Sequence, residues 1–438
     1  MSADAPRPES VTGNYFVSAY PPFSCWQPGD VAAFRRVLAS PPDRADPRPL
    51  GLYVHIPFCV KRCDYCYYLS YDDRTEQIDR YLEAVLREAA LYAAEPALSG
   101  RELSFVYFGG GTPSMLSGER IRRLLTGLQE VWPWSGVREV TFECAPKTVN
   151  ADKLRLLREC GVTRVSLGVQ DFDDRVLERS ARIHRVRDIE RALAAIRPVG
   201  FDVVNIDLIV GLPGSTDASN DHAFERAVEL EPDSVTVYQL EVPFNTPLAR
   251  ALRDGAVSEL PLAWSAKRER LARGFVRLEQ AGYTVRSGYS AVRDPRRHRF
   301  VYQDELYGGA DLLGLGASSF SYLGGVHQQN QAALGAYVEP LVTGGFPWWR
   351  AYELAADERL VRELVLRLKL GRVEFGALRR RYGLEVSARF ADVLGELERA
   401  GWLVVEDDAI VLTRAGLLRV DRLIPRFYLP PHQGLRYA

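Results

Sequence analysis

Short apolar segments alternate with amphipathic stretches over more than half of this 438-residue chain. Repeated strand–helix units imply a parallel sheet with helices on its outside. Six such units predict an α/β fold, a partial (β/α)6 parallel barrel with its chemistry at the C-terminal ends of the strands. The expected strands are 52–56, 103–108, 139–144, 164–169, 203–210 and 234–242, and the expected helices include 78–94, 118–131, 151–159, 188–197 and 263–281.

Three further regions flank the barrel, which we place at residues 51–285. Residues 1–50 are rich in proline, but the aromatic residues within 14–26 predict an ordered arm, followed by a linker. Residues 286–350 are glycine-rich and less regular, and we interpret them as an irregular segment that covers the pocket. Residues 351–438 indicate helices followed by a hairpin, which is typical of a winged-helix-like helical domain.

Charge and hydropathy restrict the partners. Lys and Arg total 56 against 57 Asp and Glu, a formal net charge of −1, which gives no general attraction to nucleic acid. The run Arg379-Arg380-Arg381 is better explained as a solvated helix face than as a nucleic-acid contact. The polar N-terminus does not resemble a secretory signal, and no segment approaches ~18 apolar residues. We therefore expect a cytoplasmic chain with no membrane contact.

Three of the six cysteines lie within eight residues, directly after the first expected strand. Cys59, Cys63 and Cys66 form a C-x3-C-x2-C spacing, which in a reducing compartment indicates metal or redox ligands. Zinc usually needs a fourth ligand, and the nearby His55 lies inside the strand. Three cysteines leave one iron of a [4Fe-4S] cluster open for a substrate. A zinc site and buried structural cysteines are the alternatives.

Other motifs accompany the cysteine motif. Tyr65 precedes the third cysteine, and the chain contains, in this order, "LYVHIPFC", "GGGTP", "GVQDF", "NIDLIVGLP" and "ADLLGLGASSFSYLGG". Together they resemble the radical S-adenosylmethionine (radical SAM) superfamily, and within it the oxygen-independent coproporphyrinogen III dehydrogenase family, over nearly the whole chain. The resemblance implies that the cysteines hold a [4Fe-4S] cluster that binds S-adenosylmethionine (SAM). One electron, supplied by a donor such as flavodoxin or ferredoxin, would then cleave SAM to a 5′-deoxyadenosyl radical.

Polar residues at the strand ends are candidates for the cosubstrate site. Asp207 interrupts an almost wholly apolar strand, where a charge is costly unless it is paired or binds a ligand. Glu143 ends the third expected strand, although a surface acid at a loop edge is the alternative. The resemblance implies that both contact SAM, and it adds Tyr53, Tyr65, Gly110, Gly111, Thr112, Gln170 and Arg182. For Arg182 the alternative is a solvated helix face.

Two departures from the decarboxylating member of the family guide the functional prediction. That enzyme has a further cysteine where this chain has Tyr68, and a cation in its N-terminal arm where this chain has none. Propionates need cations to hold them. We therefore favour radical alkyl transfer, a methylation or cyclopropanation of an sp2 carbon in a small metabolite, with a second SAM as one-carbon donor. Glu241 and Tyr238 are the candidate catalytic residues.

Two alternatives remain open. One is oxidative decarboxylation of coproporphyrinogen III in haem biosynthesis. The other is a haem chaperone, for which His55, His184 and His327 are the candidate haem ligands, although single histidines are usually structural.

Overall fold

A single large sheet organises the computed structural model, which describes residues 19–43, 47–257 and 261–435. Its twelve strands follow the order β12-β11-β10-β9-β1-β2-β3-β4-β5-β6-β8-β7. Six consecutive strands are parallel and confirm the predicted barrel units: β1 (Leu50–Ile56), β2 (Leu103–Gly110), β3 (Glu139–Cys144), β4 (Arg164–Gln170), β5 (Val203–Val210) and β6 (Ser234–Gln239).

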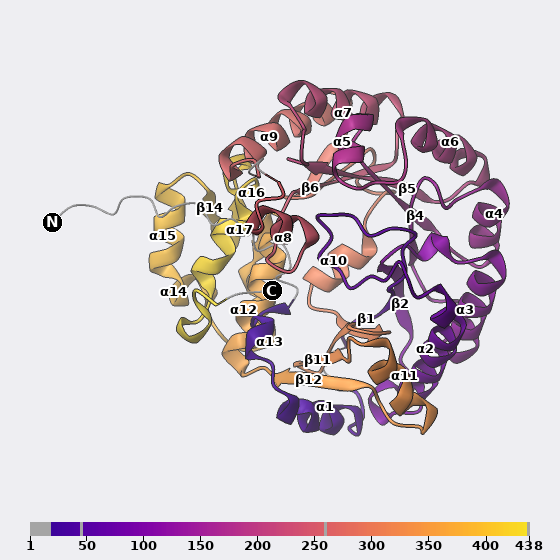
Figure 1. Ribbon diagram of the computed structural model, residues 1–438. Coiled ribbons are helices and arrows are strands. Elements are labelled where there is room, and N and C mark those ends of the chain that lie inside the picture. Colours follow the sequence, from indigo (N-terminus) through magenta and orange to yellow (C-terminus); the bar gives the residue numbers. More distant parts are fainter. Residues whose placement is uncertain (1–18, 44–46, 258–260, 436–438) are drawn as a thin grey trace.

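Helices cover the outside of these strands and form the outer ring in Figure 1. They begin where side chains cap them: Asn150 accepts from the backbone N–H of Lys153, and Thr216 from that of Ser219. The main covering helices are α2 (Ile78–Ala93), α3 (Gly118–Val131), α4 (Ala151–Glu159), α6 (Val186–Ile196), α7 (Asp217–Glu229) and α9 (Trp264–Gln280). No range for α7 was given among the expected helices, and its apolar face consists largely of Ala223, Phe224 and Ala227.

The two faces of the barrel strands differ in chemistry. On β5, Ile206, Leu208 and Val210 are buried beneath the helices, and each such side chain contributes about 1.5–3 kcal/mol. The alternate residues Asn205 and Asp207 face the barrel interior, because side chains in a strand alternate between its faces. The barrel is therefore apolar outside and polar inside, where a ligand can bind.

The segment 286–350, which we predicted to be irregular, instead extends the sheet at both ends. At one end β7 (Thr284–Ser287) and β8 (Ser290–Val292) add antiparallel strands to β6. At the other, β9 pairs in parallel with β1, and three antiparallel strands follow. These are β9 (Asp311–Leu315), β10 (Phe320–Leu323), β11 (Val326–Asn330) and β12 (Trp348–Glu353). Because β9 and β11 are buried on both faces, their sequences lack the alternation that marks a strand.

Two helices of the same region border the barrel. Helix α10 (Val301–Tyr307) lies within the ring of strands in Figure 1 and contacts β2, whereas α11 (Leu334–Val342) packs on α2.

The C-terminal part of the chain forms the predicted helical domain with a winged hairpin. Its elements are α12 (Ala356–Leu368), β13 (Arg372–Glu374), α13 (Phe375–Tyr382), α14 (Val386–Arg389), α15 (Ala391–Arg399), β14 (Leu403–Glu406) and β15 (Ala409–Leu412), followed by α16 (Arg414–Leu417) and α17 (Val420–Leu423). Within the arginine run, Arg379 pairs with Glu385 at 3.2 Å and Arg381 with Glu363 at 2.7 Å. Two of the three arginines thus have partners inside the domain.

The described part of the N-terminal arm packs on the sheet edge. Gln27 and Ala351 of β12 exchange backbone hydrogen bonds of 3.0 and 3.1 Å, and α1 (Val31–Leu38) lies against β12. Residues 14–18 of the predicted arm lie outside the described residues. Within the described ranges, no helix is long and apolar enough to cross a membrane.

Candidate active site

The three clustered cysteines lie on the cluster loop, residues 57–71, which leaves the C-terminal end of β1. The loop is held by backbone hydrogen bonds from Cys59 to Tyr71 (2.9 Å) and from Cys66 to Cys63 (3.1 Å). Two thiols have polar neighbours: Thr112 donates to Cys59 Sγ at 3.5 Å, and Arg182 Nη1 donates to Cys63 Sγ at 3.3 Å.

This donor set fits a [4Fe-4S] cluster. In the part of the chain that the structure describes, no three His, Cys, Asp or Glu side chains converge on one point that could hold a single metal ion. A cluster needs no such convergence, because each cysteine binds a different iron. The buried Oε1 of Gln170, at the end of the neighbouring β4, has no hydrogen-bond partner among the described residues. A buried acceptor without a partner in the protein is expected where a bound molecule supplies the hydrogen-bond donor.

The glycine segment after β2 closes against the cluster loop. Gly111 and Thr112 donate backbone hydrogen bonds to Ile56 and Phe58 at 2.9 and 2.7 Å. A Cβ on Gly111 would lie 2.7 Å from both of these carbonyl oxygens. Glycine is therefore required here, because its missing side chain lets two backbones approach.

Glu143 lies at the end of β3 and faces the barrel interior, so it is not a surface acid. Its Oε1 accepts from the Tyr107 hydroxyl at 2.7 Å, and its Oε2 from the backbone of Gly110 at 3.2 Å. Burial, with a smaller contribution from the nearby Asp207, raises the pKa of Glu143 to about 7, although the hydrogen bonds from Tyr107 and Gly110 oppose the shift. The carboxyl group can therefore exchange a proton near neutral pH.

Asp207 on β5 is supported by its neighbours in the sheet. Its carboxylate accepts from Ser166 of β4 at 3.0 Å and from Asn205 at 2.9 Å. Burial raises its pKa to about 6, although these hydrogen bonds oppose the shift. The polar neighbours explain how an otherwise apolar strand tolerates the acid.

Arg182 joins β4 to the cluster loop, so it does not lie on a solvated helix face. It follows α5 (Asp174–Arg179), and its Nη2 donates to the Gly168 carbonyl at 2.7 Å while Nη1 reaches Cys63. Gln170 next to it has a φ of 72°, a left-handed conformation that turns the chain at the strand end.

Tyr53 and Tyr65 differ in position. The Tyr53 ring stacks on Tyr107 with centroids 5.8 Å apart, and its hydroxyl donates to His55 Nδ1 at 3.2 Å. Tyr53 lines the large cavity described next, but Tyr65 packs on the apolar cluster that includes Val176 and Leu240. The structure thus places Tyr53, but not Tyr65, on the cavity wall.

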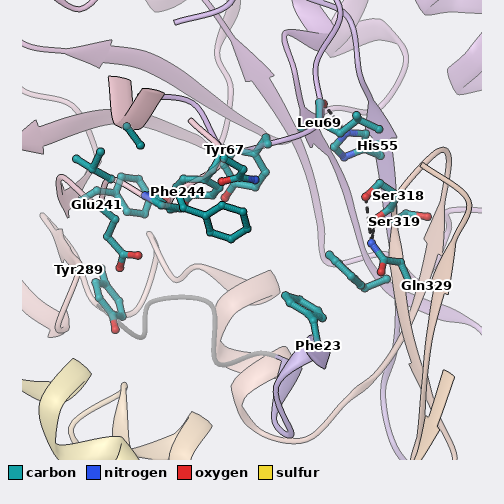
Figure 2. Close-up of a pocket in the computed structure, with 18 of the residues that line it drawn as sticks. Phe23, His55, Tyr67, Leu69, Glu241, Phe244, Tyr289, Ser318, Ser319 and Gln329 are labelled. Carbon is teal, nitrogen blue, oxygen red and sulfur yellow. Dashed lines mark hydrogen bonds between the residues drawn. The ribbon is translucent and has the colours of Figure 1, made fainter. Parts of the chain in front are cut away.

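A cavity of about 1300 Å³ opens beside the cluster loop. The candidate catalytic residues both line it: the Tyr238 residue is 42% exposed toward it, and Glu241 is buried. Figure 2 shows Glu241 and Tyr289 on one side of this space and His55 and Gln329 on the other, with Phe23 of the arm between them. The aromatic lining includes Phe23, Tyr53, Tyr67, Tyr68, Tyr107, Tyr238, Phe244, Trp264, Tyr289, Phe300, Tyr302, Tyr307, Phe320 and Tyr428.

The sequence patterns did not predict that three basic residues line this cavity. Arg253, Lys267 and Arg350 come from α8 (Pro247–Arg253), α9 and β12. Nothing in their local patterns distinguishes them from ordinary surface cations. The aromatic density of residues 300–307 was the one available signal that α10 would line a pocket.

The three histidines proposed as haem ligands are bound within the protein. His55, His184 and His327 are buried, and each has a ring nitrogen 3.0–3.1 Å from a backbone carbonyl, those of Leu69, Val169 and Tyr20. Burial lowers the pKa of all three, to about 4 for His55 and about 3 for His184. His55 has partners at both ring nitrogens, and His184 and His327 do not line the large cavity, which favours structural roles for all three.

Comparison with known proteins identifies the family. The radical SAM superfamily pattern matches residues 53–227, and the HemN C-terminal domain pattern matches residues 354–419. The oxygen-independent coproporphyrinogen III oxidase of Salmonella typhimurium is 33% identical over 412 residues, 90% of this chain and 87% of the relative. This chain belongs to that family of radical SAM enzymes.

Two further relatives support this family assignment. The solved coproporphyrinogen III oxidase HemN of Escherichia coli superposes with a TM-score of 0.81 at 30% identity, covering 94% of this chain and 96% of its own. The heme chaperone HemW of Bacillus subtilis is 29% identical over 380 residues, 86% of this chain and 98% of the relative.

Family membership assigns the cofactors. A radical SAM enzyme uses a [4Fe-4S] cluster and SAM, and the cluster supplies the electron that cleaves SAM. In this chain Cys59, Cys63 and Cys66 would hold the cluster. The strand-end residues Gly110, Glu143 and Asp207 surround the adjacent space as candidate SAM contacts.

Proposed function

We propose that this chain is an oxygen-independent coproporphyrinogen III oxidase, which uses the 5′-deoxyadenosyl radical to decarboxylate propionate side chains of coproporphyrinogen III oxidatively. The observation that carries the proposal is the large aromatic cavity beside the cluster loop. Its volume of about 1300 Å³ exceeds the ~300–1,000 Å³ of ordinary small-molecule pockets. Such a volume suits a tetrapyrrole beside SAM better than a small metabolite alone.

The charges on the cavity wall support a substrate that carries several carboxylates. Arg253, Lys267 and Arg350 all line the cavity. We predicted alkyl transfer partly because the arm lacks a cation, but Arg350 supplies one next to the arm. Its Nη1 donates to the Phe23 carbonyl at 2.9 Å, and its Nε donates to Gln329 at 2.7 Å. A cation held at the arm by the sheet can meet a propionate as well as one carried by the arm itself.

The comparisons also favour decarboxylation over the predicted alkyl transfer. The relatives named above that cover most of the chain are coproporphyrinogen III oxidases and a haem chaperone. Tyr68 replaces the extra cysteine of the decarboxylase, but it lines the cavity, and its ring centroid lies 4.7 Å from that of Tyr67 in a tilted arrangement. The replacement therefore changes the cavity wall and leaves the three cluster cysteines intact.

Two residues of this wall are placed to handle protons. Glu241 is buried at the cavity and Tyr238 lies at the end of β6, where loops of such barrels carry chemistry. Glu241 would accept a proton from the bound substrate or orient it in the cavity. The second SAM molecule remains part of the prediction, and the stoichiometry of SAM consumed per product tests it.

An anaerobic assay tests the proposal. Reconstituted protein, SAM, a reductant and coproporphyrinogen III should yield carbon dioxide, methionine and 5′-deoxyadenosine, with a porphyrinogen that has lost propionate carboxyl groups. Formation of S-adenosylhomocysteine with a gain of about 14 mass units on a substrate would instead support alkyl transfer. No decarboxylated porphyrinogen with an intact, SAM-cleaving cluster would contradict the proposal.

A haem chaperone is the second candidate, supported by a relative that aligns over 98% of its length. The candidate histidines weigh against it, because both ring nitrogens of His55 have hydrogen-bond partners and neither His184 nor His327 lines the large cavity. A haem titration with no Soret change would exclude it, whereas a saturable shift at one equivalent would favour it over the oxidase.

A further inference from the structure

A row of buried polar side chains crosses the inside of the barrel, between Asp207 and the N-terminal ends of the strands. Its members are Arg164 and Ser166 of β4, Asn205 of β5 and Ser234 of β6. In the sheet register Asn205 pairs with Ser166 on one side and with Ser234 on the other. The side chains therefore lie next to one another on the inner face of three neighbouring parallel strands.

Arg164 fixes the direction of the hydrogen bonds in this row. Its Nη2 donates to Ser234 Oγ at 3.1 Å, and its guanidinium carbon lies 4.2 Å from the centroid of the Phe300 ring. Because a guanidinium can only donate, Ser234 Oγ accepts this bond and keeps its own hydrogen for another partner. That partner is Asn205, whose Oδ1 accepts from Ser234 at 2.8 Å.

Asn205 transmits this direction to Asp207. Its Oδ1 also accepts from Thr236 at 3.0 Å, so hydroxyl groups occupy both of its acceptor positions. Its Nδ2 donates to Ser166 Oγ at 2.8 Å and to Asp207 Oδ1 at 2.9 Å. Ser166 in turn donates to Asp207 Oδ2 at 3.0 Å. Each carboxylate oxygen of Asp207 therefore accepts a hydrogen bond, and both bonds depend on the orientation of one amide.

We propose that Arg164 and Ser234 are positioning residues, which act through Asn205 to hold the Asp207 carboxylate in the orientation in which it meets SAM. We call Arg164, Ser234 and Asn205 the relay. Without it, the amide of Asn205 could turn by 180° and present its oxygen to the carboxylate, and two acceptors would then face each other. The proposal rests on the assignment of Asp207 to the SAM site and not on the identity of the substrate.

The charges around Asp207 act on it through space as well. Burial raises the pKa of Asp207 to about 6, while its hydrogen bonds and the charges of Arg164 and Arg182 oppose the shift. Further titratable groups that sense its charge are Glu143 of β3, Tyr107 of β2 and Tyr238 of β6. A test of the relay must therefore separate hydrogen bonding from the direct attraction between Arg164 and Asp207.

NMR of the cluster-free protein tests the relay without SAM. Aspartate labelled with 13C at the carboxyl group gives titration curves, and the curve that disappears in Asp207→Asn belongs to Asp207. Ser234→Ala removes no charge, yet it should raise this pKa by about 0.5, because the amide of Asn205 is then less firmly oriented. Asn205→Asp should raise it by more than about 1, since an acceptor then faces the carboxylate. The matched control is Thr141→Val on the inner face of β3, which removes a buried hydroxyl that donates to Glu139 at 3.2 Å and should leave the curve unchanged.

A double-mutant cycle separates the relay from attraction through space. If Arg164 acts through Ser234, Arg164→Met should raise the pKa of Asp207 about half as much in the Ser234→Ala background as in the wild type, because the relay is already broken there. Equal shifts in the two backgrounds would overturn the proposal, and so would an unchanged pKa in Ser234→Ala. If Arg164→Met does not fold, the Ser234→Ala curve decides alone.

Equilibrium binding of SAM to the reconstituted enzyme connects the relay to the reaction. Ser234→Ala should weaken SAM binding about 3-fold at neutral pH and have no further effect in an Asp207→Asn background. A loss of the same size in both backgrounds would overturn the proposal, because Ser234 would then act independently of Asp207. An unchanged SAM affinity in Asp207→Asn would overturn the link to SAM, and the NMR titration would still decide whether the relay exists.

Discussion

The two walls of the cavity are built in opposite ways. On the wall at the cluster loop, polar groups are held by neighbouring strands: Glu143 of β3 by Tyr107 of β2, and Asp207 of β5 by Ser166 of β4. On the wall beside the arm, Arg350 of β12 reaches Phe23 of the arm, 327 positions away. The first wall is thus fixed by the parallel sheet itself, whereas the second depends on packing between distant segments. Substitutions should therefore affect SAM at the first wall and the substrate at the second.

The strongest test removes the centre of the first wall. Replacing Cys59, Cys63 and Cys66 together by alanine should abolish the iron–sulfur absorbance and all SAM cleavage, because no other described thiol lies on the loop. Circular dichroism should show the fold retained, since the thiols are not core residues of the sheet. Cys25→Ala in the arm serves as control and should keep both signals. An active triple variant would contradict the cluster assignment.

A smaller effect is expected from the carboxylate of the first wall. The pKa of Glu143 is raised to about 7, so its carboxylate forms as the pH rises past 7. If it holds the cationic methionyl amine, SAM affinity should increase from pH 6 to pH 8. Glu143→Gln should lower affinity about 10-fold at pH 8 and remove the pH dependence, since a charged hydrogen bond is worth about 1.5–3 kcal/mol. Equilibrium binding at the two pH values measures this, and a flat wild-type profile would count against the contact.

A substitution in the second wall should change the KM for the substrate and leave SAM cleavage unchanged. Arg350→Ala should raise the KM for coproporphyrinogen III about 10-fold through loss of a carboxylate contact, while SAM cleavage without substrate stays unchanged. Arg359→Ala is the control, because Arg359 binds the Leu354 carbonyl at 3.0 Å and does not line the cavity. Steady-state kinetics and a thermal-unfolding check separate substrate binding from loss of the arm. If Arg350→Ala changed SAM cleavage alone, the assignment of SAM to the first wall and of the substrate to the second would be wrong.

The last test concerns stability rather than activity. Glu88 is buried and accepts from Asn330, Gly316 and Tyr337 at 2.6, 2.9 and 2.6 Å. Burial raises its pKa from 4.5 to about 7. The folded state therefore holds this proton more tightly than the unfolded chain, so the contribution to stability is complete below pH 4.5 and is lost as the pH rises through 7.

Chemical denaturation at several pH values measures the contribution of Glu88. Between pH 4.5 and 8 the wild type should lose up to about 3 kcal/mol relative to Glu88→Gln. Parallel profiles for the two proteins would assign the pH dependence to other buried acids.

The sequence predicted the first wall well because its parts are local. The cysteine spacing lies within one loop, and the strands that carry Glu143 and Asp207 follow one another in the sheet as they do in the chain. Tyr65, adjacent to Cys66 in sequence, packs against an apolar cluster, and its contact with SAM stays a prediction. Strands β9 and β11 were missed because burial on both faces removes alternation.

By itself, the sequence determined the barrel, the three-cysteine loop and the radical SAM chemistry, since each depends on short-range patterns that survive without knowledge of the fold. Only the tertiary structure decided which distant residues line the cavity. Arg350, Lys267 and Tyr289 line it from β12, α9 and the turn between β7 and β8. No local pattern encodes this shared lining, because it arises from the course of an open twelve-stranded sheet and the packing of the arm and C-terminal domain against it. This is why the sequence of the arm alone did not reveal the cation that Arg350 places beside it.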